Sequence, residues 1–140
     1  MKYTAILIVI LIMIPTLIFA ECFNYEPDIT ILTGKIIRET FPGWPNYESI
    51  RGGDEPETYW ILNLANPVCV NALQGDLSYP FESRIKHVQL ILMGDEYKKH
   101  KNLVGKDVVV TGQLMPMQTG HHYTRVLMIV KEIQRGNKKR

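Results

Sequence analysis

Cysteine is scarce in this sequence, and neither sign of charge dominates. Only Cys22 and Cys69 are present, and the formal net charge of +2 falls to +1 when Lys2 is left out. Because this balance provides no general attraction for phosphate backbones, no nucleic-acid partner is expected. Catalytic motifs are also missing, since Ser49 lies in no nucleophile elbow and the histidines show no His-x-His or His-x-x-x-His spacing. These absences favour a non-enzymatic role, and no cofactor is expected.

The long apolar run of the chain is confined to its start. Residues 5–19 are almost unbroken apolar sequence, Lys2 precedes them, and the small residue Ala20 follows. This pattern predicts a secretory signal peptide over residues 1–20. The alternative is an uncleaved anchor, but the run is short for a spanning helix and Pro15 interrupts it. We therefore expect a periplasmic or secreted protein without a stable membrane anchor after cleavage.

Export affects the interpretation of the two cysteines. An oxidising compartment predicts a disulfide between Cys22 and Cys69, which would tie the mature N-terminus to the middle of the chain. The alternative is a pair of free thiols.

The rest of the chain predicts one all-β domain over residues 21–134, followed by a basic, flexible tail over residues 135–140. Strands are expected at residues 29–38, 59–64 (with 68–72 as a possible continuation), 84–93, 106–114 and 123–133. A short helix over residues 96–103, capped by Asp95, is expected between the third and fourth strands. Gly34 and Gly112 lie inside strands, as at barrel bends. The order is typical of a five-stranded OB-like Greek-key barrel, and a β-sandwich is the alternative.

Two irregular segments interrupt this pattern. The longer one, residues 41–57, combines closely spaced prolines and glycines with Phe41, Trp44 and Tyr47. Long ordered loops are usually functional, and the aromatic residues argue against disorder. The shorter segment covers residues 115–124. In an OB-like barrel these two loops lie on one side of the molecule, so we expect them to be neighbours.

The sequence also resembles a known family. The resemblance runs from Cys22 to Ile133 and is carried by the motifs FPGWPNYESI, GDEPET, YWIL, PVCV, VQLIL, LVGKDVVVTGQL and TGHHYTRVLM. They resemble a family of small secreted bacterial proteins catalogued as domain of unknown function 4431. The resemblance implies an OB-like periplasmic or secreted domain with a binding role in the envelope, and it assigns no catalytic residue.

The primary hypothesis is a binding module that engages an envelope protein or glycan through the two loops, as an inhibitor or an accessory subunit. The expected binding residues are Phe41, Trp44, Asn46, Tyr47, Glu48, Asp54, Glu57, Thr119, His121 and His122. Trp and Tyr commonly anchor interfaces or stack on sugars.

Two alternatives remain open. A metal-dependent hydrolase would use His121, His122 and acidic loop residues such as Asp54. In the competing interpretation, one histidine binds the long loop, the other is solvated, and the carboxylates are solvated or paired with Arg51 or Arg125. The second alternative is a purely structural envelope domain, in which both loops only stabilise the barrel.

Overall fold

The computed structural model describes residues 22–137. The predicted signal peptide and the last three residues of the predicted tail lie outside this range. The elements are β1 (Cys22–Phe23), β2 (Thr30–Pro42), η1 (Ile50–Gly52), β3 (Pro56–Val70), β4 (Glu82–Ile91), α1 (Glu96–Lys99), η2 (Lys101–Leu103), β5 (Asp107–Pro116) and β6 (Val126–Arg135).

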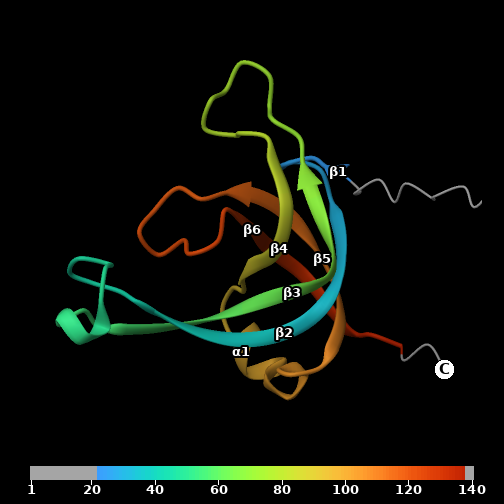
Figure 1. The fold of residues 1–140 in the computed structure, drawn as a ribbon. Helices are drawn as coiled ribbons and strands as arrows, with labels where there is room; N and C mark the ends of the chain where they lie inside the picture. The colour runs from blue at the N-terminus through green and yellow to red at the C-terminus, as the bar shows by residue number, and fades with distance from the viewer. Residues whose placement is uncertain (1–21, 138–140) are drawn as a thin grey trace, which may run out of the picture.

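Strands β2 to β6 close into a five-stranded barrel. The sheet order is β1-β3-β2-β5-β6-β4, and an additional pairing between β3 and β4 closes the ring. All pairings in the ring are antiparallel except that of β4 with β6. The short helix α1 lies between β4 and β5 at the bottom of the view in Figure 1. This is the Greek-key order of the OB-like barrel, so the predicted fold class is confirmed.

Alternation along the strands builds the core. In β2, Leu32 and Ile36 point inward and are buried, whereas Ile31 and Lys35 are exposed. The glycines at the expected bends lie where strands approach closely. A Cβ atom at Gly34 would lie 2.9 Å from the carbonyl carbon of Asn63, and one at Gly112 would overlap the backbone of Ile129. A register shift in the pairing of β5 with β6 also falls at Gly112. Glycine is therefore needed at both positions because two backbones approach closely there.

Several expected boundaries were wrong. Strand β3 runs from Pro56 through Pro67 to Val70, although its pairing with β4 shifts register between Asn63 and Val68. Strand β6 extends to Arg135, which was expected in the flexible tail. The helix is shorter than expected, because α1 ends at Lys99 and a 3-10 turn follows. Asp95 occupies the N-cap position, but its side chain makes no capping hydrogen bond.

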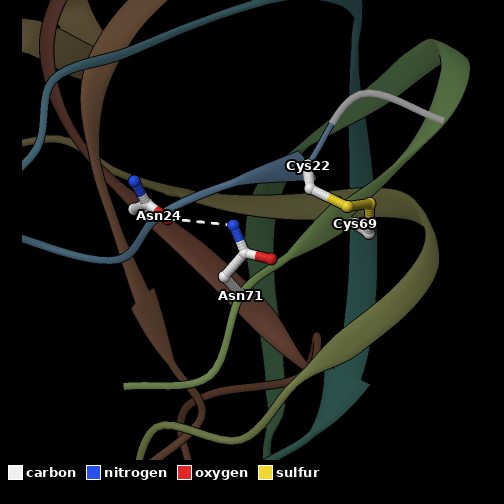
Figure 2. Close-up of a disulfide and its surroundings, with 4 residues drawn as sticks. All are labelled: Cys22, Asn24, Cys69 and Asn71. Atoms are coloured by element: carbon white, nitrogen blue, oxygen red, sulfur yellow. Dashed lines mark hydrogen bonds between the residues drawn. A yellow bond between two sulfur atoms is a disulfide. The ribbon is translucent and has the colours of Figure 1, made fainter. Parts of the chain in front are cut away.

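The predicted disulfide between Cys22 and Cys69 is present. Figure 2 shows how it joins β1 to β3. Beside it, the side-chain nitrogen of Asn71 donates a hydrogen bond of 3.0 Å to the side-chain oxygen of Asn24. Strand β1, which was not predicted, pairs in parallel with β3 at this crosslink. Between residues 22 and 137, no helix combines the length and apolar character needed to cross a membrane.

Candidate binding site at the junction of two loops

The loop between β2 and β3 (residues 43–55, here the β2–β3 loop) is organised around the carboxylate of Asp54. One oxygen of Asp54 accepts hydrogen bonds from the backbone and side-chain nitrogens of Asn46, at 2.9 and 3.1 Å. The other oxygen accepts from the backbone nitrogens of Glu48 and Ser49, both at 2.8 Å. These backbone donors lower the pKa of Asp54 from its usual value, most strongly those of Ser49 and Glu48. The hydrogen bonds of this carboxylate therefore hold residues 46–49 of the loop in place.

Backbone hydrogen bonds hold the base of the same loop. The Glu55 amide donates to the Trp44 carbonyl at 2.8 Å, and the Gly43 amide donates to the Glu55 carbonyl at 2.7 Å. The Tyr47 amide closes a turn onto the Gly43 carbonyl at 2.9 Å. Trp44 consequently has a fixed backbone, while its side chain is 63% exposed.

The β2–β3 loop and the loop between β5 and β6 (residues 117–125, here the β5–β6 loop) meet through His121. The two loops extend on the same side of the barrel in Figure 1. His121 Nδ1 lies 2.8 Å from a carboxylate oxygen of Glu57, and His121 Nε2 lies 3.3 Å from the Tyr47 hydroxyl. Because an ionised carboxylate only accepts hydrogen bonds, Nδ1 carries the proton, and in the neutral imidazole Nε2 accepts from Tyr47. The expectation that the loops are neighbours is confirmed.

Glu57 is the centre of a wider hydrogen-bond network. The same oxygen that faces His121 lies 3.0 Å from the hydroxyl groups of both Tyr59 and Tyr123. These contacts, that of His121 first, lower the pKa of Glu57. Burial and the neighbouring carboxylate raise the pKa of Tyr59 to about 12 and raise that of Tyr123 as well. Both phenols are therefore protonated donors to an ionised Glu57.

Tyr123 also joins the loops by ring packing. Its ring stacks on Phe41, with centroids 4.3 Å apart and planes inclined by 6°. Its hydroxyl lies 3.0 Å from the Pro42 carbonyl as well as from Glu57. Phe41 is thus a supporting contact at the end of β2, and both residues are half-buried.

The buried side chain of Gln89 holds the β5–β6 loop on the barrel. This β4 residue is 2% exposed, and its side-chain nitrogen donates to the His121 carbonyl at 2.9 Å. Its side-chain oxygen accepts from the Tyr123 amide at 2.7 Å. Sequence reasoning missed Gln89, although a glutamine inside the apolar stretch VQLILM was a usable signal, because buried polar side chains need partners.

A close contact fixes the position of Tyr47 between the loops. Its backbone has a φ of 60°, which is uncommon for a residue with a side chain. A Cβ atom at Gly120 would lie 3.2–3.3 Å from atoms of the Tyr47 ring. The ring therefore packs directly on the glycine backbone, and a larger residue at position 120 would displace it.

The other predicted site residues lie apart from this junction. Glu48 has an exposed side chain and contributes its amide to the Asp54 carboxylate. Thr119 is exposed, and its carbonyl accepts from the His122 amide at 3.0 Å. His122 Nδ1 accepts from the Gln118 amide at 3.0 Å, and burial lowers the pKa of His122. His121 is therefore the histidine that contacts the β2–β3 loop, whereas His122 stabilises a turn within the β5–β6 loop.

The residues of the metal hypothesis face three different environments. Asp54 binds its own loop, His121 binds Glu57 and Tyr47, and His122 binds the backbone of Gln118. Within residues 22–137 no group of three histidine, cysteine or acidic side chains is arranged to hold a metal ion. The loop carboxylates were expected to be solvated or to pair with Arg51 or Arg125. Among the ion pairs of this range the arginine pairing does not occur, and Arg125 pairs with Glu82.

The fold and the loop junction define a small OB-like β-barrel domain stapled by one disulfide. Residues 87–134 match the family described as Domain of unknown function (DUF4431). This match confirms the family resemblance over a segment that contains His121, His122, Tyr123 and Gln89. No curated protein matches the chain.

Proposed function

We propose that this protein is a non-enzymatic binding domain of the bacterial envelope, with Trp44 as the anchor for a protein or a glycan. The observation that carries the proposal is that the Trp44 side chain is 63% exposed on a loop with a fixed backbone. Single exposed apolar side chains are common on protein surfaces, but an exposed tryptophan is informative because tryptophan is enriched among the residues that anchor interfaces.

The rigidity of the loop supports a binding role. Asp54 holds the backbone from inside, and the Glu55 amide holds the Trp44 carbonyl. The His121–Glu57 contact ties the base of the loop to the β5–β6 loop. A side chain presented on an ordered loop loses less conformational entropy on binding than one on a mobile segment.

The exposed area of Trp44 sets the scale of the interaction. A tryptophan buries up to about 250 Å², so on the order of 150 Å² is still available at 63% exposure. At about 25 cal/mol per Å², complete burial against a partner contributes roughly 4 kcal/mol. Tryptophan anchors in interfaces lose about 2 kcal/mol or more on truncation, which corresponds to about 30-fold in affinity.

Placement in the envelope rests on two further observations. The sequence of residues 1–20 has the pattern of a secretory signal, and the Cys22–Cys69 disulfide is compatible with an oxidising compartment.

The test is capture on the immobilised protein from two separate preparations, soluble envelope proteins and isolated cell-wall glycan. The variants are Trp44→Ala, Trp44→Phe and the matched control Leu77→Ala, which truncates a fully exposed apolar side chain in the loop between β3 and β4. We expect one preparation to yield a ligand that the wild type and Leu77→Ala retain, that Trp44→Ala loses, and that Trp44→Phe retains in part. Equal capture by Trp44→Ala, or no capture from either preparation, would contradict the proposal.

Stability measurements separate this proposal from a purely structural role. Because most of the Trp44 side chain lies in solvent, Trp44→Ala should change the free energy of unfolding by less than about 0.5 kcal/mol. A clearly lower stability would instead indicate that Trp44 supports the barrel.

A further inference from the structure

We propose that a cavity at the start of β4 binds a small anionic group, a phosphate or a carboxylate. The cavity has a volume of about 270 Å³ and lies between β4 and the end of the β5–β6 loop. Besides the apolar side chain of Ile85, it is lined by Arg84, Lys86, His87, Tyr123, Thr124 and Arg125.

All charged residues that line this cavity are cationic, and one of them, Arg125, is paired with the carboxylate of Glu82, which is not a lining residue. Three of its residues carry a formal positive charge, His87 adds an ionisable imidazole, and no carboxylate is among the lining residues. Such a concentration of one sign around a concave surface attracts small ions of the opposite sign. The overall charge of the chain is nearly balanced, so this attraction is local.

The positively charged side chains of the cavity differ in whether they already bind other atoms of the protein. Arg125 donates to Glu82 and to the Ser83 carbonyl, and the Lys86 ammonium donates to the Ala65 carbonyl at 3.0 Å. Arg84 and His87 are exposed, and their side chains make no hydrogen bond or ion pair with another residue of the 22–137 range. Arg84 is therefore the guanidinium that is free to take a ligand beside two cations that are already held in place.

The backbone of Arg84 provides a second, independent observation. Its φ is 54°, in the left-handed region that favours glycine. The pairing of β3 with β4 shifts register on both sides of Val68, which pairs with Ile85 next to Arg84. Strained positions of this kind cluster at binding sites, and a glycine would occupy this one without strain. The presence of an arginine at this strained position is consistent with a binding role for its side chain.

The chemistry and the size of the cavity point to a single small group. A guanidinium presents a planar fork of donors that matches the oxygens of phosphate and carboxylate groups. The Thr124 hydroxyl already donates to the Val126 carbonyl, and the Tyr123 hydroxyl already lies against Pro42 and Glu57. A volume of about 270 Å³ is slightly below the usual range for whole drug-sized ligands. The cavity therefore fits one charged group of a ligand.

This inference does not rest on the proposed function. The cavity shares Tyr123 with the loop junction, but it contains neither Trp44 nor any other residue of the β2–β3 loop. A negative result for the cavity therefore does not affect the proposal for Trp44, and the reverse also holds.

The test is a titration of the isotope-labelled protein, followed through its backbone amide chemical shifts at constant ionic strength. The probes are inorganic phosphate, glucose 6-phosphate, glucuronate and, as the neutral control, glucose. We expect saturable shift changes at residues 84–87 and 123–125 with a phosphate probe, with glucuronate, or with both, and none with glucose. The comparison of the phosphate and carboxylate probes identifies the preferred group. Absence of saturation with every anion would overturn the proposal.

Two variants make the test specific to Arg84. Arg84→Gly removes the guanidinium and relieves the strained backbone, so binding should weaken about tenfold or more while the unfolding midpoint does not fall. Arg38→Gln removes the same charge from an exposed position of β2 and should leave the affinity unchanged within about twofold. Wild-type affinity in Arg84→Gly, or an equal loss in Arg38→Gln, would overturn the proposal.

Discussion

Replacement of both Cys22 and Cys69 by alanine removes the covalent tie between β1 and β3 while leaving every other side chain in place. The two cysteines are 47 positions apart in the sequence, and they pair directly across the two strands. In the folded protein the crosslink closes a loop that contains all of β2 and most of β3. In the unfolded chain it restricts the same segment, and this restriction is the main source of its stabilising effect.

The size of the effect follows from the length of the closed loop. In the chain-entropy model, a loop of this length stabilises the folded state by about 4 kcal/mol. Denatured chains keep some residual structure, so we expect a measured loss of about 2–4 kcal/mol. For a domain of this size, with a urea m-value of about 1.5 kcal/mol/M, the midpoint should fall by roughly 1.3–2.7 M.

The assay is urea unfolding of the wild type and the double variant, followed by tryptophan fluorescence and circular dichroism. Asn71→Ala is the matched local control, because it removes the neighbouring hydrogen bond to Asn24 without opening the covalent loop, and it should cost less than about 1 kcal/mol. A loss below about 1 kcal/mol in the double variant, or an equal loss in Asn71→Ala, would refute the reasoning from loop closure.

Three further perturbations address the barrel and the loop junction. Gly112→Ala should destabilise the protein by about 1–3 kcal/mol in urea unfolding, because the new methyl group meets the backbone of β6, whereas Gly52→Ala meets no atom closer than 3.4 Å and should be nearly neutral. Tyr123→Phe keeps the stack on Phe41 but loses the hydroxyl contacts, so its unfolding free energy should fall by about 1 kcal/mol, and an unchanged value would contradict the network. The pKa of Glu57 is lowered by folding, so its ionised form stabilises the protein above pH 4.5, and this stabilisation is lost as pH falls through the lower folded value. Glu57→Gln should therefore reduce the decrease in unfolding free energy at acidic pH. An unchanged pH dependence would contradict the lowered pKa of Glu57 in the folded protein.

Much of the barrel could be predicted from local sequence. The apolar alternation and the internal glycines Gly34 and Gly112 indicated the strands and their bends, because a missing side chain is needed where two backbones approach closely. Strand β1 could not be found in the same way, since two residues carry no periodicity. Its only signal was the disulfide, which places Cys22 beside Cys69.

The loop junction was predictable in location and not in detail. Fold topology brought the two loops together, and His121 was among the expected residues. The structural task of Asp54 was not predicted, because a buried carboxylate that binds backbone amides has the same sequence appearance as a solvated one. The left-handed backbone of Arg84 could not be predicted either, because it lies beside an irregular pairing of β3 with β4 that has no local sequence signal.

The most direct test of the central claim is site-specific photo-crosslinking in cells that produce the protein. A photoreactive phenylalanine analogue replaces Trp44 in one variant, where its aromatic ring preserves the partial binding expected of Trp44→Phe, and replaces the exposed Leu77 in the control. The account predicts a covalent adduct with an envelope protein or glycan from position 44 and none from position 77. An absence of adduct at position 44, or the same adduct from both positions, would contradict the assignment of Trp44 as the binding anchor.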